Sequence, residues 1–390
     1  MRKKLFSTAA IVSFIMFYTA CSKPSMPGSW ITLDTGTIDA FSSVNFVNDK
    51  VGFINAWTDR NYEPLGADAN TNTNVNTNAN SNSSTAPKNA NANTGGKKKP
   101  DPLKANDGFE VLQTTDGGET WNQLPEQFKY RIRSVWFVDP QTGWALTLDR
   151  DILKTSDGAK TWVTQRKAGK VKLKLLANRR TPETEQPEQI ERVHFVDANH
   201  GWAWGGGVKN DYSEQPGIFL ITIDGGQNWN QIKYPFEQNI SSIFFLNAQH
   251  AWANIAEGGL YKTDDGGVTW IKAATKTPEL TFDSIFFVDE QNGWVAGHSG
   301  KMAKTSDGGR TWKKIFSVKD EYKVRDLHFS DKDHGYAVGD NGIILYTADG
   351  GESWVVVTPA GEAALKDVLF INQNTGWAVG LEGALLRHEP

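Results

Sequence analysis

Two repeated strings and their spacing predict an all-β fold, namely a seven-bladed β-propeller. The string Thr-x-Asp-Gly-Gly-x-Thr-Trp occurs six times with small variations. A second string, in which Phe, an apolar residue and Asp or Asn precede Gly-Trp-Ala, occurs seven times in a looser form. From Trp252 onward this second string recurs every 41 or 42 residues, and a fixed period of this size is typical of solenoids and propellers.

Each period is predicted to hold four short strands. In the fifth period, apolar runs cover residues 284–289, 293–297, 302–305 and 311–315, and Gly, Asn or Asp follows each run. Because no helical periodicity is present, the four runs are interpreted as one blade. The Asp-Gly-Gly turn suits the connection between the third and fourth strands, since Asp accepts backbone N–H groups, Gly adopts positive φ and Trp packs between blades.

The ring is predicted to close with strands from both ends of the chain. The seventh copy ends at residues 385–388 without an Asp-Gly-Gly string or a terminal Trp, whereas the segment around Trp30 resembles the strand that follows such a string. We therefore expect residues 30–33 to complete the last blade beside residues 384–388. This arrangement leaves no open sheet edge where the two ends meet.

Residues 1–20 have the pattern of a secretory signal peptide, with a basic start and an apolar run that is short for a membrane span. The run ends in small residues before Cys21, the only cysteine, and this stretch resembles a bacterial lipobox whose cysteine is lipidated. Residues 21–28 would then be a tether and residues 29–390 the propeller. The pattern predicts an exported protein, lipid-anchored on the periplasmic or extracellular side of a membrane; the alternative is an ordinary cleaved signal.

Three insertions interrupt the period, at residues 60–107, 163–190 and 205–217. In a four-stranded blade they all fall on the face opposite the Asp-Gly-Gly turns, which we call the top face. The first insertion, rich in Asn, Thr and Lys, is predicted to be disordered. The second carries seven Lys or Arg residues and no acid over 166–180, which would suit contact with anionic lipid head groups; the alternative, slightly favoured, is a solvated charged loop.

Cations recur at the start of the innermost strand, four residues before its Phe, where the top mouth of the ring is expected. Round the ring this position is occupied by Ser42, Arg133, Glu191, Ser241, Asp283, Arg325 and Lys366. Three further cations, Arg131, Arg192 and Lys323, lie next to it in sequence. These cations are candidates for a partner-binding surface; the alternative is an ordinary solvated rim.

The Thr-x-Asp-Gly-Gly-x-Thr-Trp string is the BNR or Asp-box repeat. Its pairing with Phe-Val-Asp-x-x-x-Gly-Trp-Ala-x-Gly, over roughly residues 29–390, resembles the photosystem II stability/assembly factor family. The resemblance implies a seven-bladed propeller and a non-enzymatic chaperone on the lumenal or periplasmic side that holds a membrane protein or complex during assembly. That partner would be of photosystem type if the source organism is phototrophic. The resemblance also implies an arginine-bearing partner surface, which Arg133, Arg325 and Lys366 could supply.

The aspartates of the six boxes are predicted to be structural, because a turn is needed in every blade whereas a site is needed once. They are Asp116, Asp157, Asp224, Asp265, Asp307 and Asp349. No zinc or calcium spacing motif and no Gly-rich phosphate loop is present, so we expect no metal and no cofactor. With a formal net charge of -4, the chain is also a poor candidate for nucleic-acid binding.

Two rival functions stay open at this point. A glycan or surface polymer could bind top-face aromatics such as Trp204 and Tyr212. A sialidase-like glycosidase would need a close pair of carboxylates, and Glu191, Asp283 and Glu257 are merely acidic residues with no marked pairing. The even period favours a monomeric binding scaffold that is not an enzyme.

Overall fold

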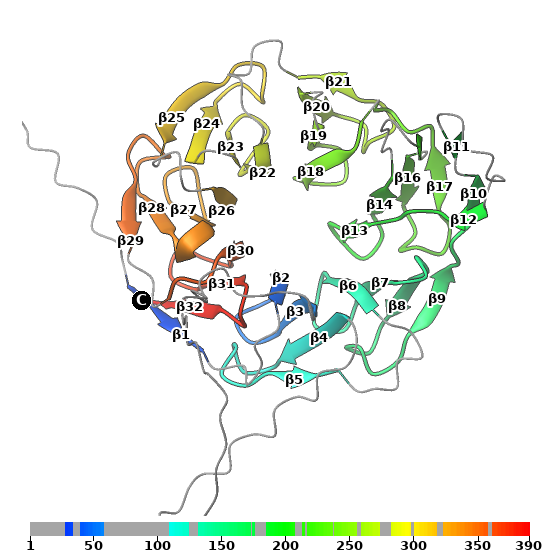
Figure 1. Cartoon of the computed structure of the whole chain (residues 1–390), viewed down its shortest axis with the longest axis horizontal. Coiled ribbons are helices and arrows are strands. Elements are labelled where there is room, and N and C mark those ends of the chain that lie inside the picture. Colours follow the sequence, from blue (N-terminus) through cyan, green and yellow to red (C-terminus); the bar gives the residue numbers. More distant parts are fainter. Residues whose placement is uncertain are drawn as a thin grey trace, which may run out of the picture.

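The structure is a computed structural model, and it forms a ring of β-sheets (Figure 1). It describes residues 28–33, 40–57, 109–124, 132–172, 174–175, 185–206, 213–214, 217–236, 238–255, 259–273, 282–297, 300–317, 323–357 and 361–390. Within these residues, no helix has the length and apolar character needed to cross a membrane. The seven four-stranded sheets confirm the predicted seven-bladed propeller.

The first four blades each use four antiparallel strands in chain order, innermost strand first. Blade 1 comprises β2 (Ala40–Phe46), β3 (Gly52–Trp57), β4 (Phe109–Thr114) and β5 (Asn122–Gln123). Blade 2 comprises β6 (Ile132–Phe137), β7 (Gly143–Thr147), β8 (Ile152–Thr155) and β9 (Val163–Arg166). Blade 3 comprises β13 (Arg192–Phe195), β14 (Gly201–Gly205), β16 (Ile218–Thr222) and β17 (Asn230–Ile232). Blade 4 comprises β18 (Ile240–Phe245), β19 (Ala251–Ile255), β20 (Gly259–Thr263) and β21 (Ile271–Lys272).

The remaining blades complete the ring. Blade 5 comprises β22 (Phe282–Phe287), β23 (Gly293–Gly297), β24 (Lys301–Thr305) and β25 (Lys313–Ser317). Blade 6 comprises β26 (Val324–Phe329), β27 (Gly335–Gly339), β28 (Ile344–Thr347) and β29 (Val355–Val357), with the short 3-10 helix η2 (Asp340–Gly342) after β27. Blade 7 comprises β30 (Leu365–Phe370), β31 (Gly376–Gly380), β32 (Leu385–Glu389) and, from the other end of the chain, β1 (Ser29–Thr32).

The N-terminal strand closes the last blade as predicted. β1 pairs antiparallel with β32 from Ser29 opposite Glu389 to Thr32 opposite Leu386. Trp30 stands edge-on to Phe370, with ring centroids 5.7 Å apart and planes at 85°. Trp354 of blade 6 meets Phe329 in the same way, at 5.9 Å and 87°. Trp30 therefore takes the place of an Asp-box tryptophan in blade 7.

Stacked aromatic rings join each blade to the next, from the second strand of one to the first strand of its neighbour. The seven pairs, with centroids 3.4 to 4.1 Å apart, are Trp377–Phe46, Phe53–Phe137, Trp144–Phe195, Trp202–Phe245, Trp252–Phe287, Trp294–Phe329 and Tyr336–Phe370. These rings are among the most deeply buried side chains, and truncating such an aromatic to Ala costs about 3–5 kcal/mol. The hydrophobic core thus lies mainly at the interfaces between neighbouring blades.

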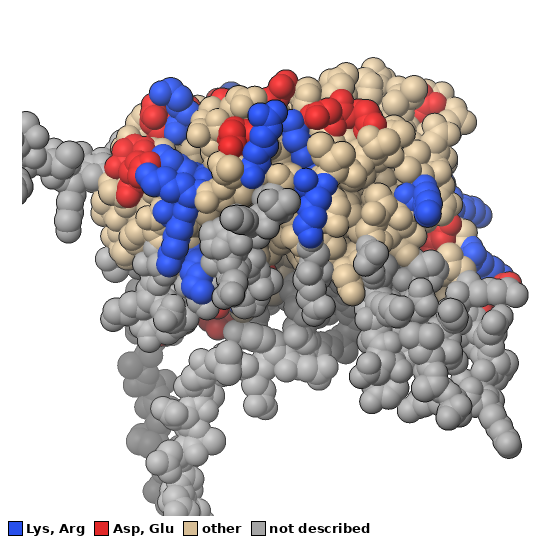
Figure 2. All heavy atoms as spheres, turned by 90° about the horizontal axis from the view of Figure 1, so that it is seen from above, with Lys and Arg blue, Asp and Glu red and all other residues tan. Residues whose placement is uncertain are grey.

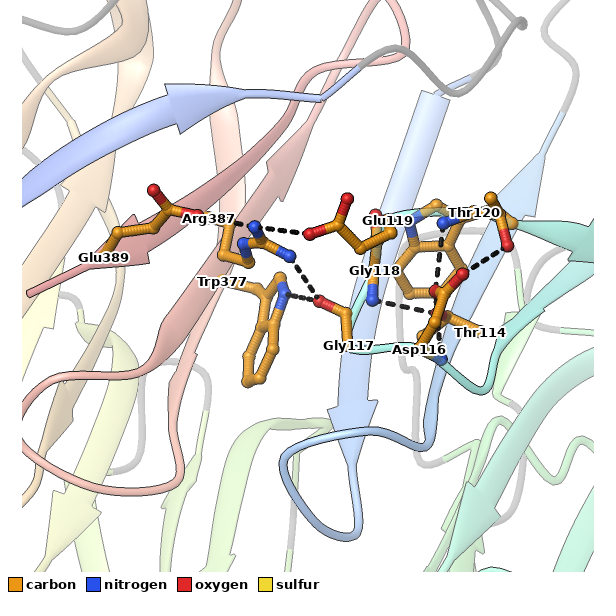
Figure 3. A network of polar contacts seen from close by, with 10 residues as sticks. Thr114, Asp116, Gly117, Gly118, Glu119, Thr120, Trp377, Arg387 and Glu389 are labelled. Atoms are coloured by element: carbon orange, nitrogen blue, oxygen red, sulfur yellow. Dashed lines mark hydrogen bonds and ion pairs between the residues drawn. The ribbon is translucent and has the colours of Figure 1, made fainter.

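The seam between blades 7 and 1 joins the two ends of the ring (Figure 3). The Trp377 indole N–H donates to the carbonyl of Gly117 in the first Asp box, 3.3 Å away. Arg387 of β32 donates to the same carbonyl at 3.2 Å and forms an ion pair with Glu119 at 2.9 Å. A hydrogen bond from a Trp to the first glycine of the next box also occurs between blades 2 and 3, 3 and 4, 4 and 5, and 5 and 6.

The second glycine of a box lies against the tryptophan of the preceding blade. At Gly118, Gly226, Gly267, Gly309 and Gly351 φ is positive, and an added Cβ would lie 3.1 to 3.5 Å from the indole Nε1 of the preceding blade's Trp. The second box carries Ala159 instead, at φ 70°. Ala159 packs in the cluster of Phe53 and Phe137, where the preceding blade offers a phenyl ring and no indole. The smaller ring leaves room for the Cβ.

The insertions differ in part from the predicted boundaries. Residues 163–166 are β9, the outer strand of blade 2, so the second insertion begins only after Arg166. Within it, β10 (Lys170–Lys172) pairs with β12 (Glu185–Pro187). A further pair joins β11 (Lys174–Leu175) to β15 (Ser213–Glu214), which connects the second insertion to the third. The predicted disordered insertion, residues 60–107, lies outside the described residues.

Candidate functional site

The Asp boxes are built as self-contained turns. In the second box, Asp157 accepts hydrogen bonds from the Thr155 hydroxyl at 2.8 Å, the Thr161 amide at 2.9 Å and the Thr161 hydroxyl at 2.6 Å. The Gly158 amide donates to the Gln141 carbonyl in the turn between the first two strands, which places both turns on one face, the bottom face. The other five boxes repeat the Asp and threonine pattern, with Asn228 or Ser353 in place of the last Thr in two of them.

These hydrogen bonds account for the repeated aspartates without a ligand. Hydrogen bonds from the side chain and amide of Thr161 lower the pKa of Asp157 to about 2, so the carboxylate is ionised at any physiological pH. Within the described part of the chain, no group of three or more His, Cys, Asp or Glu side chains is placed to hold a metal ion. The box aspartates stabilise turns, one in each of six blades.

Five of the six predicted partner-binding cations lie on the top face in two clusters. The first, which we call the blade 5–7 cluster, consists of Lys323, Arg325 and Lys366 with two carboxylates. Lys323 forms an ion pair with Asp283 at 3.0 Å, and Arg325 with Asp340 of η2 at 2.7 Å. Burial lowers the pKa of Lys366, and the nearby charges of Arg325 and Lys323 lower it further while Asp340 opposes them. Three cations thus share two carboxylates.

The second group, the blade 2–3 cluster, consists of Arg133, Arg150 and Arg192 with Glu191. Burial, followed by the charge of Arg133, lowers the pKa of both other arginines, and Glu191 acts in the opposite direction. Arg192 lies at the start of β13, with its side chain near enough to Asp367 of blade 7 for the two charges to interact. The blade 2–3 cluster therefore also carries more positive than negative groups.

Arg150 was missed by the sequence prediction. It lies in the turn between β7 and β8 with φ 70°, a left-handed conformation that is uncommon for a residue with a side chain. Its guanidinium donates to the Ile190 carbonyl at 2.9 Å and to the Gln189 side chain at 3.2 Å. The turn of blade 2 thereby holds the segment that leads into β13. Its positive φ could not be read from the sequence, because no Gly or Asn marks the position.

Several other predicted residues have no place in a top-face site or cannot be assigned one. Trp204, proposed as a glycan platform, is only 8% exposed and packs against Phe245, so that prediction is wrong for this residue. Arg166, part of the basic segment proposed for lipid, is ion-paired with Glu188 at 2.6 Å. Cys21, Arg131, Tyr212 and Glu257 lie outside the described residues.

The outer rim carries charges of both signs. In the side view of Figure 2, Lys and Arg side chains alternate with Asp and Glu over the described rim. Lys304 and Lys313, for example, both form ion pairs with Glu352 across the seam of blades 5 and 6. Exposed pairs of this kind contribute little to stability. In the two top-face clusters, by contrast, cations from different strands lie close enough to lower the pKa of one another.

Known proteins share both the repeat and the fold. The family described as "Photosynthesis system II assembly factor YCF48" matches residues 223–319 and 316–389. The photosystem II assembly lipoprotein Ycf48 of Synechococcus sp. (strain CC9902) is 25% identical over 166 residues, 41% of this chain and 42% of that protein. The chloroplastic photosystem II stability/assembly factor HCF136 of Arabidopsis thaliana is 24% identical over 37% of this chain and 31% of its own length. The chain thus aligns with less than half of either relative.

Solved structures match over nearly the whole chain. A structure described as YCF48 bound to D1 peptide covers 95% of this chain and all of its own, with 17% identity and a TM-score of 0.62. YCF48 from Cyanidioschyzon merolae covers 93% of this chain at 18% identity with the same TM-score. At this identity the structural likeness establishes the fold. The sequence matches, in turn, confirm that the chain resembles the photosystem II stability/assembly factor family.

Proposed function

We propose that the protein is a non-enzymatic scaffold that holds an acidic or carboxylate-bearing segment of a membrane protein on its top face. The observation that carries this proposal is the close grouping of cations in two clusters on that face, built on strands that the ring fixes in place. In the blade 5–7 cluster, Asp283 and Asp340 hold Lys323 and Arg325, and Lys366 lies beside them. Cations that are positioned before a partner arrives lose less conformational entropy on binding.

The described acids of the top face serve as binding partners for its cations. Of the acids considered for glycosidase chemistry, Asp283 is ion-paired with Lys323, and Glu191 lies among arginines. Both carboxylates therefore serve as counter-ions to the cations of their clusters. The arrangement therefore supports recognition of a negatively charged partner.

The location of the protein belongs to the same proposal. The signal-like residues 1–20 and Cys21 favour export and lipid attachment on the periplasmic or extracellular side of a membrane. One relative with a similar repeat is itself named a lipoprotein, and a protein of similar fold has been solved with a peptide of D1. In a phototrophic source, a photosystem subunit would be the first partner to test.

Affinity capture from native membranes after mild crosslinking tests the function. The wild-type chain is compared with an Arg133→Glu, Arg325→Glu and Lys366→Glu triple variant, which reverses charge in both clusters. We expect the wild type to recover a defined membrane protein. The amount recovered with the triple variant should be at least tenfold lower, since each lost charged contact costs about 1.5–3 kcal/mol.

The matched control reverses three cations on the bottom face, Lys50→Glu, Lys160→Glu and Lys332→Glu, which change the net charge equally. All three lie in bottom-face turns. If the control loses the partner as fully as the top-face variant, general charge and not the two clusters governs capture. If the triple variant retains the partner, the proposed site is wrong.

A further inference from the structure

A pair of aspartates lies where the last blades meet, apart from the groups used above. Each innermost strand has one residue three positions before its Phe. Round the ring this residue is Ser43, Ser134, Arg192, Ser242, Ser284, Asp326 and Asp367. The aspartates therefore occupy equivalent positions on β26 and β30, the first strands of neighbouring blades. Four of the other five positions are serines, so the acidic pair is specific to blades 6 and 7.

Both carboxyls link one blade to the next. Asp326 accepts the Ser284 hydroxyl of blade 5 at 2.7 Å and the Val368 amide of blade 7 at 3.0 Å. Asp367 accepts the Val44 amide of blade 1 at 2.7 Å. Asp326 thus bonds the backbone next to Asp367, and the two carboxyls lie close enough for each to shift the pKa of the other. A continuous line of hydrogen bonds thus runs through four blades and crosses the seam where the ring closes.

A direct hydrogen bond between the two carboxyls requires a proton, because two carboxylates offer acceptors only. We propose that Asp326 and Asp367 share one proton at neutral pH, and that this proton fastens blades 5, 6, 7 and 1 so that acidification tightens the closing seam. Burial raises the pKa of both groups, and the neighbouring Asp326 raises that of Asp367 further. The proton therefore stays bound in the folded ring at a pH where the unfolded chain has released it.

Other charged groups around the pair set its response. Arg192 faces Asp367 from β13 and favours its ionised form, which opposes burial. Nearby charged or titratable groups on the packed elements are Asp283 on β22, Arg325 and His328 on β26, Lys366 on β30 and Asp340 in η2. His328, and His194 on β13, are held neutral because burial lowers their pKa to about 3. They lose stabilisation on acidification, in the opposite direction to the pair.

The sign follows from proton linkage. An aspartate in the unfolded chain has a pKa of about 4, and the folded pair has a higher pKa. The stabilisation from the shared proton is therefore fully present below about pH 4 and is lost as the pH rises through the pKa of the folded pair. Because the histidines respond to pH in the opposite direction, the stability of the wild type measured by itself does not reveal the contribution of the aspartate pair. The informative quantity is the difference between the wild type and Asp367→Asn, since asparagine can still donate to Asp326 and accept from Val44 but cannot titrate.

The test is urea unfolding of the full chain from pH 4.5 to 8.5 for the wild type, Asp367→Asn and the control Asp333→Asn. The control removes a bottom-face charge of blade 6, the blade that carries Asp326. We expect Asp367→Asn to gain stability relative to the wild type as the pH rises, by up to about tenfold in the unfolding constant per pH unit. Asp333→Asn should show no such gain. A pH-independent difference for Asp367→Asn would overturn the proposal.

Infrared spectroscopy gives a second readout that does not depend on a well-folded variant. At pH 7 the wild type should show the carbonyl stretch of a protonated carboxylic acid, and this band should be missing from Asp367→Asn and Asp326→Asn. A wild-type spectrum without that band would also overturn the proposal. Neither result depends on whether the top face binds a partner, so this inference stands or falls separately from the proposed function.

Discussion

The seam between blades 5 and 6 and the seam between blades 6 and 7 meet the same packing requirement with different groups. At the first, Trp294 stacks on Phe329 and its indole N–H donates to the Gly350 carbonyl of the next Asp box at 3.0 Å. At the second, Tyr336 stacks on Phe370 and its hydroxyl contacts the ring of His388 at 3.2 Å. His388 in turn contacts the Asn374 carbonyl at 2.9 Å through its other ring nitrogen.

The difference follows from how the ring closes. Blade 7 has no Asp box, because its third and fourth strands, β32 and β1, come from opposite ends of the chain and no turn joins them. A tryptophan at position 336 would have no box carbonyl to bond. The Tyr336 hydroxyl contacts His388 instead. The seam therefore keeps a buried polar contact, whereas the indole N–H of a tryptophan would be left unpaired. The two departures from the repeat, Tyr336 and the missing box, therefore have one cause.

The strongest way to break this comparison is to remove β1. A chain that begins at residue 34 should lose the cooperative thermal transition of a chain that begins at residue 28. The deletion exposes the edge of β32 and removes Trp30, which packs partly buried against the core of blade 7. Truncating a fully buried Trp costs about 3–5 kcal/mol, so this side chain contributes a smaller part of the loss. Differential scanning calorimetry of the two chains measures the effect. Equal melting temperatures would show that β1 does not close the ring.

The indole–glycine contact can be tested at the seam of blades 5 and 6. In Gly351→Ala the new Cβ would lie 2.8 Å from Ile315 and 3.3 Å from the Trp294 indole nitrogen, at φ 86°. We expect a loss of about 1–3 kcal/mol from overpacking, in addition to about 1–2 kcal/mol for the left-handed backbone. Ala159→Gly, where a phenyl ring replaces the indole, should change stability by less than about 1 kcal/mol. Urea unfolding at neutral pH compares them, and similar losses for both variants would refute the coupling.

The smallest expected effect concerns the Asp-box turn, which blade 7 does not have. Hydrogen bonds lower the pKa of Asp157 to about 2, whereas an aspartate in the unfolded chain has a pKa of about 4. The stabilisation from the ionised carboxylate is therefore fully present above about pH 4 and is lost as the pH falls toward 2. Asp157→Asn should be less stable than the wild type at neutral pH, and the gap should narrow between pH 4 and 2. Thermal unfolding at several pH values measures it. A constant gap would mean that the ionised form of Asp157 is not what holds the turn.

Features that repeat with the period could be predicted from the sequence. Strand order and the position of the Asp boxes depend on residues close together in the chain. The closing role of Trp30, whose strand pairs with the other end of the chain, followed from counting the repeats. The predicted inner strand at 284–289 is observed as β22 two residues earlier, because apolar alternation does not mark strand ends sharply. Register within a blade is therefore readable from local spacing.

Contacts between blades could not be predicted in this way. The ion pair of Lys323 with Asp283 joins residues of neighbouring blades, and Arg150 reaches Gln189 across an insertion. Asp326 and Asp367 looked like two unrelated strand residues until the ring placed them side by side. Side chains of this kind depend on the twist between sheets and on loop conformation, which a single sequence does not reveal.

The pairing of β1 with β32 also has a mechanical consequence. The N-terminal end of β1 lies opposite Glu389, at the very end of β32, so tension applied through residue 28 acts first on the Ser29–Glu389 pair. The load would then peel the strand away one pair at a time, up to Thr32 opposite Leu386. A membrane tether on this chain would thus load the strand pair that closes the ring, and blade 7 would be the first place where the ring opens.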